Sequence, residues 1–531
     1  MSSDDTVITA ANPREPWWPW LLFGLAACWV VLIRAPLILN ADRHLDSDLA
    51  VDGLTLLEAT QGHWRWHYPG TPYMGIAPVL LSWPQAMLFG TSPTTLVSGG
   101  TVAYLGLLLG TFLLARSAFG HAVAAWALVP LAFASNGAVW LSGRITGGHL
   151  PAAAWHAGAF ALLVPCLRRG GWPRALALGI WCGLGVSLDS MFLVTLAGLI
   201  PAAALFGLRS GATRTSLALA VVFVSGLAVG LGSGFVGARI DPHNAYEQQF
   251  GLVNRGDVLL AHADILVRKC LPRLFAGHQL PDLETDPSVA ELSMPFYDRP
   301  TGQKGLLPYA ATALGLGLWA AAMIRLAAAS LFSGDATMRA VTFGLLVSGI
   351  ATAAAFVTNR NIFNSDNYRY LVTLLVAWAI GFGLLMNWLC QRGSGGRILA
   401  ALVTIALAVV MTEDLARWYH GFGWLDSSYR PVHNQVDDPI LKWLEGEPAI
   451  EWIEGGYWDV YRLCFLSSGR LRGAPFPIYP NRFPEWRPSS GAGRAVVVRA
   501  TPEGAAFRES ALRAGGRIAG RARGATLIVL P

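Results

Sequence analysis

Long apolar segments alternate with short polar connectors over most of the chain. Most of these segments contain about 18 to 22 residues, the length that an α-helix needs to cross the hydrocarbon core of a bilayer. The pattern predicts a polytopic α-helical membrane protein with about 11 transmembrane helices. We expect them at about 17–35, 94–115, 122–141, 150–167, 175–189, 191–208, 215–236, 306–324, 340–357, 370–389 and 398–412.

The positions of arginine predict how these helices are oriented. Arginines gather in alternate connectors, which the positive-inside rule places in the cytoplasm. The N-terminus lacks the basic start and the cleavage site of a secretory signal, so residues 1–16 are predicted to be a cytoplasmic tail. An odd number of crossings then exports the C-terminus. The arginines concerned are Arg116, Arg168, Arg169, Arg174, Arg209, Arg214, Arg325, Arg339, Arg392 and Arg397.

The large polar segments are predicted to face the outside. They are a first loop at 36–93, a second loop at 237–305 and a tail at 413–531. Within the first loop, 76–90 is short and contains proline, which favours an interfacial helix lying along the membrane. The second loop is polar enough for a lid or an acceptor groove, and an unstructured connector is the alternative. The tail predicts a small extracytoplasmic α/β domain, with helices in "DPILKWLEGEP" and "TPEGAAFRESALRAGG" and strands in "RAVVVRA" and "ATLIVLP".

Composition and charge agree with a membrane protein. Of the 531 residues, 53% are hydrophobic and only 14% are charged, which is too little charge to cover a soluble protein of this size. The net charge of +6 is dispersed among connectors and forms no basic face, so we expect no nucleic acid partner. The six cysteines have no metal-ligand spacing, and the sequence contains no HExxH motif.

The first outer loop concentrates acidic and aromatic residues. Ser47 can cap a helix that runs through "DLAVDGLTLLEAT" and stops at Gly62. Asp48 then lies in the first turn and Asp46 just before the cap, where backbone donors favour an ionised carboxylate. One interpretation is that these acids only cap a helix. The other is that one of them acts as a base in a pocket at the membrane surface.

The sequence "LDSDLAVDGLTLLEATQGHWRWHYPGTPYMGIAPVLLSWPQAMLFGTSP" resembles the first extracytoplasmic loop of the GT-C superfamily of integral-membrane glycosyltransferases. The similarity is greatest to bacterial relatives of the protein mannosyltransferase and aminoarabinose transferase group. Asp48 matches the acidic position of that loop, and Gly70, Tyr73 and Gly75 match a Gly-x-x-Tyr-x-Gly-like turn. "GLGVSLDSMF" with Asp189 and "NSDNYRYL" with Arg369 resemble two later motifs. "YWDVYRLCFLS" and "NRFPEW" resemble an outer C-terminal domain found in part of the group.

This resemblance implies a sugar donor carried on a polyprenyl phosphate and an inverting transfer to an acceptor on the outer face of the bacterial plasma (inner) membrane. The acceptor would be an envelope protein, a glycolipid or a polymer. A positioned carboxylate can take the proton of an acceptor hydroxyl. Asp48 is the candidate base, and Asp46 would take that role if the helix began elsewhere.

The leaving lipid phosphate needs cations, and an arginine fork can hold two of its oxygens. Arg369 is the first candidate, supported by Arg144 and Arg360, although the high arginine content of the chain is an alternative explanation. Further candidates for substrate binding are His67, Tyr73, His149 and Asp189. For His67 and its aromatic neighbours the alternative is anchoring at the interface, for His149 a hydrogen-bonded loop position, and for Asp189 a helix cap.

Two other classes of function remain open. A transporter or flippase of a lipid-linked substrate is disfavoured by the missing inverted repeat, and a non-catalytic membrane scaffold would not need Asp48. No obligatory cofactor is expected, although a divalent cation is compatible with the family. An enzyme should have a cavity beside Asp48 that opens to lipid and is bordered by Arg369.

Overall fold

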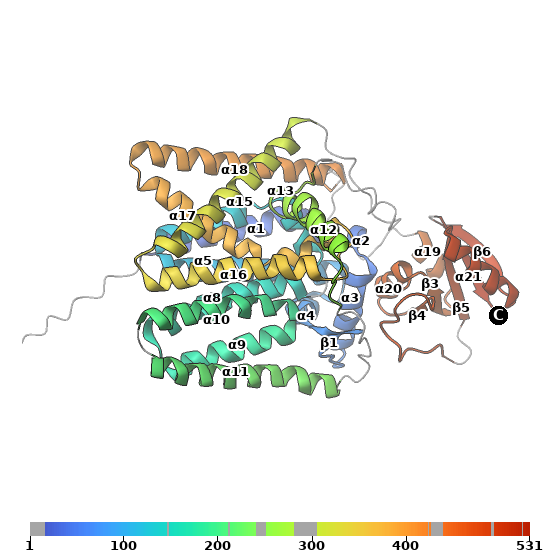
Figure 1. Cartoon of the computed structure of the whole chain (residues 1–531). Helices are drawn as coiled ribbons and strands as arrows, with labels where there is room; N and C mark the ends of the chain where they lie inside the picture. The colour runs from blue at the N-terminus through green and yellow to red at the C-terminus, as the bar shows by residue number, and fades with distance from the viewer. Residues whose placement is uncertain are drawn as a thin grey trace, which may run out of the picture.

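The computed structural model describes residues 16–145, 148–210, 213–240, 251–280, 305–422, 424–425, 439–489, 493–522 and 524–531. A bundle of long helices forms the body, and a small sheet with three helices lies at one end of it (Figure 1). Within the described residues, eight helices are long and apolar enough to cross a membrane, and two bent helix pairs raise the number to ten. The long helices are α1 (Trp18–Leu39), α5 (Pro93–Phe119), α8 (His149–Arg169), α10 (Leu193–Ser210), α11 (Thr213–Ile240), α15 (Leu306–Phe332), α16 (Ala336–Thr358) and α18 (Ser394–Gly421).

Each predicted crossing coincides with a helix, so the polytopic helical fold is confirmed. The predicted crossing at 175–189 corresponds to α9 (Trp172–Leu188), which has 17 residues and is shorter than the eight long helices. It packs along α11 and α8 in the body of the bundle. A short 3-10 turn, η2 (Ser190–Phe192), joins α9 to α10.

Two crossings are bent, which the hydrophobic pattern does not predict. α6 (His121–Ala132) and α7 (Asn136–Gly143) meet at 78°, and η4 (Ser365–Leu371) meets α17 (Leu374–Cys390) at 67°. At the first bend, Ser135 caps α7 by accepting from Ala138 N and donates to the Leu274 carbonyl at 2.7 Å. These bonds stabilise a new helix start in place of a continued helix. Both bends lie at the same end of the bundle, near the predicted outer loops.

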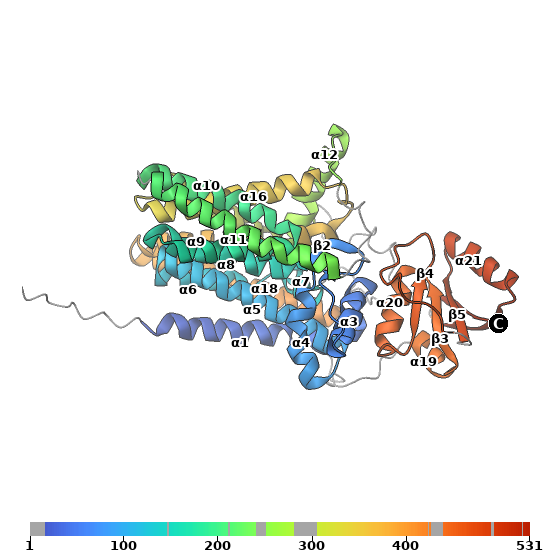
Figure 2. The same ribbon diagram turned by 90° about the horizontal axis from the view of Figure 1, so that it is seen from below.

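The connectors between the helices are of two kinds, and the two kinds lie at opposite ends of the bundle. The short connectors beside the arginines, such as the one between α5 and α6, lie at the end of the bundle far from the sheet (Figures 1 and 2). The first outer loop lies at the near end. Its elements are α2 (Ala41–His44), α3 (Ser47–Thr60), β1 (His67–Tyr68), β2 (Thr71–Gly75) and the predicted interfacial helix α4 (Ala77–Phe89), whose exposed side chains include Leu80, Met87, Leu88 and Phe89.

The second outer loop contains more regular structure than the polar pattern suggests. Residues 256–276 form α12 (Gly256–Asp264), the π-helical segment η3 (Ile265–Cys270) and α13 (Leu271–Ala276). α13 packs against α15 and α7, so this part is neither a free lid nor an unstructured connector. Residues 241–250 and 281–304 of the predicted loop lie outside the described residues.

The C-terminal segment forms the α/β fold predicted from its alternating pattern. Five strands are ordered β4-β3-β5-β7-β6. β3 is parallel to β4 and β5, whereas β7 is antiparallel to both β5 and β6. The elements are α19 (Pro439–Glu445), β3 (Ile450–Gly455), α20 (Tyr457–Leu466), β4 (Arg472–Pro475), β5 (Gly493–Arg499), α21 (Pro502–Arg513), β6 (Arg517–Ala522) and β7 (Ala525–Leu530).

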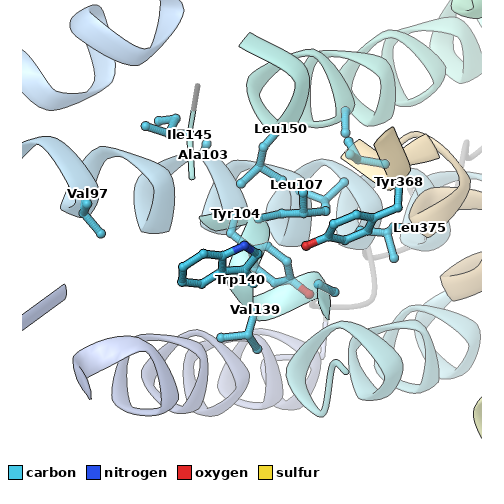
Figure 3. Close-up of a cluster of buried hydrophobic side chains, with 14 of the residues drawn as sticks. Val97, Ala103, Tyr104, Leu107, Val139, Trp140, Ile145, Leu150, Tyr368 and Leu375 are labelled. Atoms are coloured by element: carbon cyan, nitrogen blue, oxygen red, sulfur yellow. The ribbon is translucent and has the colours of Figure 1, made fainter. Parts of the chain in front are cut away.

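A buried aromatic and aliphatic cluster lies at the end of the bundle that is near the sheet. Side chains from α5, α7, η4 and α17 meet there, among them Tyr104, Trp140, Tyr368 and Leu375 (Figure 3). The Tyr368 hydroxyl donates to the Gly137 carbonyl at 2.9 Å, which fixes η4 against α7. The cluster therefore holds the two bent segments together, and their polar residues lie at the end of the bundle that is near the sheet.

Candidate active site

Asp46, and not Ser47, caps helix α3. Its Oδ1 atom accepts a hydrogen bond from Leu49 N at 2.8 Å, and its side chain is fully buried. The expected cap at Ser47 is therefore wrong by one residue. An aspartate is as good a cap as serine, and the ion pair between Asp46 and the Arg144 guanidinium further favours Asp46 at this position.

Arg144 joins the first outer loop to the bent segments of the bundle. It donates to Asp46 Oδ2 and lies 4.0 Å from Asp366 Oδ2, and Arg273 lies 3.4 Å from the other oxygen of Asp366. Burial raises the pKa of the Asp46 carboxyl, and the Arg144 charge opposes that shift. This row of alternating charges connects α3, α7, η4 and α13. Both oxygens of Asp46 and the guanidinium of Arg144 are thus engaged within the protein.

Asp48 lies two residues further along the chain, in the first turn of α3, and its surroundings differ from those of Asp46. The side chain is half-buried, and its Oδ1 atom accepts a hydrogen bond from the Tyr457 hydroxyl at 2.5 Å. The Tyr68 hydroxyl donates to the main-chain carbonyl of Asp48 at 2.9 Å. Among the residues that the structure describes, no side chain donates to the second carboxylate oxygen, Oδ2. This oxygen can accept a proton from a bound molecule.

Two residues of this site were not among the sequence candidates. Tyr457 begins α20 of the C-terminal domain, and the Arg482 Nε atom donates to the Tyr457 oxygen at 3.2 Å. Burial and the Asp48 charge raise the pKa of Tyr457 well above its usual value, so the hydroxyl keeps its proton and donates it. The available signal was the resemblance of "YWDVYRLCFLS" and "NRFPEW", since these two segments contain both residues.

Arg369 lies on η4 at the edge of the same site. Its guanidinium carbon is 5.3 Å from the centre of the Tyr370 ring, and the side chain interacts electrostatically with Asp48. The Nε atom is buried and has no acceptor among the described residues. A buried donor without an acceptor is costly, and an anionic group of a ligand would satisfy it.

His149 and Asp189 form a second polar pair close by. His149 Nδ1 and Asp189 Oδ2 are 2.9 Å apart, and the His149 ring contacts the edge of the Tyr370 ring at 4.9 Å. The Tyr370 ring therefore contacts both His149 and Arg369. Asp189 also accepts from Met191 N at 2.8 Å, which is the capping role predicted as the alternative, and its neighbour Leu188 lines a cavity.

That cavity is apolar and has a volume of about 720 Å³. The rings of Trp155 and Trp181 stack in its wall with centroids 3.7 Å apart. Neither Asp48 nor Arg369 is among its lining residues, so this cavity is not the one expected beside both of them. The lining includes Trp64, Trp66, Gly75, Ile76, Leu80, Val102, Leu109, Leu113, Pro151, Ala154, Trp155, Trp181, Leu184 and Leu188.

The β1–β2 hairpin has contacts at both the Asp48 site and the cavity. At one end, the carbonyls of Pro69 and Gly70 accept from Arg482 at 3.4 Å. At the other end, Gly75 lines the cavity and packs so closely on α9 that a Cβ atom there would lie 3.1 Å from Leu188 Cα. The hairpin therefore connects the Asp48 site to the cavity over a few residues.

The remaining candidates are less closely connected to this site. Arg360 is exposed, and its main-chain nitrogen donates to the Gly251 carbonyl at 3.1 Å. His67 is buried in the hairpin, where it pairs with Gly75. The side chain of Tyr73 lies outside the described residues. A search of the described residues finds no three His, Cys, Asp or Glu side chains grouped to hold a metal ion.

Comparison with known proteins identifies the fold. No protein-family model matches the sequence, and no curated protein matches it. Among solved structures, apo ArnT from Cupriavidus metallidurans is similar with a TM-score of 0.56 and 12% identity, covering 95% of this chain and 98% of that one. ArnT bound to undecaprenyl phosphate has a TM-score of 0.53 and 14% identity, with the same coverage.

A third structure is the oligosaccharyltransferase AglB from Archaeoglobus fulgidus, in complex with an inhibitory peptide and a dolichol-phosphate. Its TM-score is 0.55 at 15% identity, and the match covers 90% of this chain and 69% of that one. ArnT and AglB are members of the GT-C superfamily. The chain is therefore a multi-pass membrane protein with the GT-C fold, as its motifs predicted.

Proposed function

We propose that this protein is a glycosyltransferase that moves a sugar from a polyprenyl phosphate to an acceptor on the outer face of the membrane. The observation that carries this proposal is Asp48, whose Oδ1 is hydrogen-bonded to Tyr457 while Oδ2 receives no donor from the described residues. The fold supports the substrate class, since two similar structures hold undecaprenyl phosphate and a dolichol-phosphate.

In the proposed reaction, Asp48 Oδ2 takes the proton of an acceptor hydroxyl as the acceptor oxygen attacks the anomeric carbon. The bond between that carbon and the phosphate oxygen breaks on the opposite side, so the configuration inverts. Such general-base help accelerates a reaction by roughly 10²- to 10⁴-fold. Asp46 is a poor alternative, because Leu49 N and Arg144 occupy its two oxygens.

The leaving polyprenyl phosphate gains negative charge, which a fixed cation can stabilise. We assign this role to Arg369, which has a buried Nε donor without an acceptor in the described part of the chain. The isoprenoid tail would occupy the apolar cavity walled by Trp155 and Trp181. His149 and Asp189, between Arg369 and that cavity, would contact the donor near its phosphate or sugar.

The test is a turnover assay with the purified protein in liposomes. A panel of polyprenyl-phosphate sugars is offered with an envelope extract as acceptor, and release of polyprenyl phosphate is measured. Asp48→Asn keeps the shape of the side chain but removes the base, so turnover should fall roughly 10²- to 10⁴-fold. Asp335→Asn is a matched control, because Asp335 caps α16 at the other end of the bundle and asparagine caps equally well.

Equal turnover of the wild type and Asp48→Asn would refute the proposal. A flippase would move the labelled lipid across the liposome membrane without releasing polyprenyl phosphate. A scaffold would do neither, and both results would remove glycosyl transfer from consideration.

A further inference from the structure

The C-terminal domain is docked on the part of the first outer loop that carries Asp48. Helix α20 packs directly on α3. Gly53 makes the close approach possible, since a Cβ atom there would lie 2.6 Å from the Phe465 ring. The two helices are also joined by a hydrogen bond from Arg462 N to Ser47 Oγ at 3.3 Å. The first turn of α20 is thereby placed over the first turn of α3.

A second contact is made by residues 481–486, which we term the strap. Arg482 on the strap donates to the main-chain carbonyls of the β1–β2 hairpin at 3.4 Å. Glu485 forms an ion pair with Arg65, which is also paired with Glu58 at 2.8 Å. The Arg65 guanidinium stands 5.0 Å from the centre of the Phe483 ring. The strap therefore holds both the hairpin and the segment that follows α3.

We propose that Tyr457 is a positioning residue, by which the C-terminal domain fixes the catalytic carboxylate of Asp48. This inference rests on the proposed function. The Tyr457 hydroxyl holds Oδ1 at 2.5 Å, which selects one orientation of the carboxylate and leaves Oδ2, which has no donor among the described residues, to take the proton of the acceptor. Arg482 Nε donates to the Tyr457 oxygen at 3.2 Å and so directs the O–H group of Tyr457 at Asp48.

Tyr457 acts as a fixed hydrogen-bond donor and not as a second base or acid. Tyr457 is buried and retains its proton, so it does not exchange protons with the acceptor. Hydrogen bonds between a hydroxyl and an ionised carboxylate are short and strong compared with neutral ones. A side chain held within a small angular range brings its oxygen to the acceptor more often than a freely rotating one. The C-terminal domain is thus part of the active site.

Tyr457→Phe removes only the hydroxyl and keeps the ring packed between α3 and α20. The expected result is a fall in kcat of about 10- to 100-fold with the KM of the polyprenyl-phosphate donor within about two-fold of wild type. Tyr461→Phe is the matched control on the same helix. It loses a buried hydroxyl that donates to Asn481 Oδ1 at 3.0 Å and accepts from the main-chain nitrogen of Arg482 at 2.6 Å, so it perturbs the strap equally, but it leaves the Arg482 side chain and the bond from Tyr457 to Asp48 in place. Its kcat should stay within about two-fold of wild type.

A second measurement separates positioning from a general loss of stability. In the Asp48→Asn background, Tyr457→Phe should lower the residual rate by less than about two-fold, because no carboxylate is left to position. A merely structural role would lower the rate by the same factor in both backgrounds and would overturn the inference. Melting temperatures of both phenylalanine variants show whether each is folded. Should Tyr457→Phe unfold, Arg482→Met, which keeps the hydroxyl but removes its Nε donor, must lower kcat with unchanged donor KM.

The two proposals fail in different ways. Full activity of Asp48→Asn would reject the proposed function itself. Loss of activity in Asp48→Asn together with wild-type kcat in Tyr457→Phe would leave the function intact and reject Tyr457 as its positioning residue.

Discussion

Asp46 and Asp48 are separated by a single residue, yet they lie on two different faces of the start of α3. The Asp46 face contacts the helical bundle, where a main-chain N–H and the Arg144 guanidinium engage both carboxylate oxygens. The Asp48 face contacts the C-terminal domain, where one neutral hydroxyl engages one oxygen. Both residues are aspartates, and both lie at the start of the same helix. We infer that the partners of a carboxylate, and not its place in a motif, decide whether both of its oxygens serve the fold or one is left for a ligand.

The largest effect is expected from a substitution that removes the contacts of the Asp46 face. Asp46→Ala takes from the half-buried Arg144 the partner of its shortest ion pair and removes the cap of α3. Removing one partner of a fully buried ion pair costs about 3 to 5 kcal/mol, and because Arg144 is half-buried the cost should lie toward the lower end, so the melting temperature should fall clearly. Thermal unfolding in detergent, followed by tryptophan fluorescence, measures this. Asp48→Asn should change the free energy of unfolding by no more than about 1 kcal/mol, and equal destabilisation by both substitutions would contradict the comparison.

A smaller effect is expected when the Asp48 face is loosened alone. Gly53→Ala introduces a methyl group against the Phe465 ring and should cost about 1 to 3 kcal/mol at the contact between α3 and α20. The C-terminal domain would then hold Asp48 less firmly, and kcat should fall while the Asp46 face keeps its ion pairs. Limited proteolysis reports undocking of the domain. Unchanged kcat in a variant whose domain has become protease-sensitive would argue against the link between docking and catalysis.

Acidic pH should weaken the Asp46 face first. His44, which neighbours Arg144, is buried, and burial lowers its pKa from 6.5 to about 4. Between these pH values the unfolded chain binds a proton that folded His44 does not, so its contribution to stability is complete above pH 6.5 and declines as the pH falls toward 4. The slope is at most about 1.4 kcal/mol per pH unit. His44→Gln should have a flatter dependence of melting temperature on pH, and a curve parallel to that of the wild type would disprove this assignment.

The smallest effect tests the cavity independently of either face. Ala154→Phe places a ring in the cavity beside Trp155 and should raise the KM of the polyprenyl-phosphate donor by about ten-fold, with kcat nearly unchanged. Ala125→Phe is the matched control, since Ala125 lines a separate apolar cavity of about 610 Å³ between α1 and α6. Initial rates over a range of donor concentrations measure both. A larger KM for Ala125→Phe than for Ala154→Phe would move the lipid site to that other cavity.

The sequence predicts these parts of the molecule to very different degrees. Segments such as 94–115 are apolar throughout, so length and hydropathy suffice to place them. The bend before α7 depends on a bond between Ser135 and Leu274, which no local pattern contains. Asp48 belongs to a recognisable motif, whereas its partner Tyr457 is 409 residues away. Periodicity reports neighbours along a helix and cannot report such a contact.

The central claim is that base, phosphate cation and lipid cavity serve one substrate at one end of the bundle. A cryo-EM structure with bound polyprenyl phosphate tests this most directly. We expect the phosphate within hydrogen-bond distance of Arg369, on the side that faces Asp48, and the isoprenoid tail against Trp155 and Trp181. A phosphate bound at the arginine-rich end of the bundle, or a tail in the cavity between α1 and α6, would contradict the account.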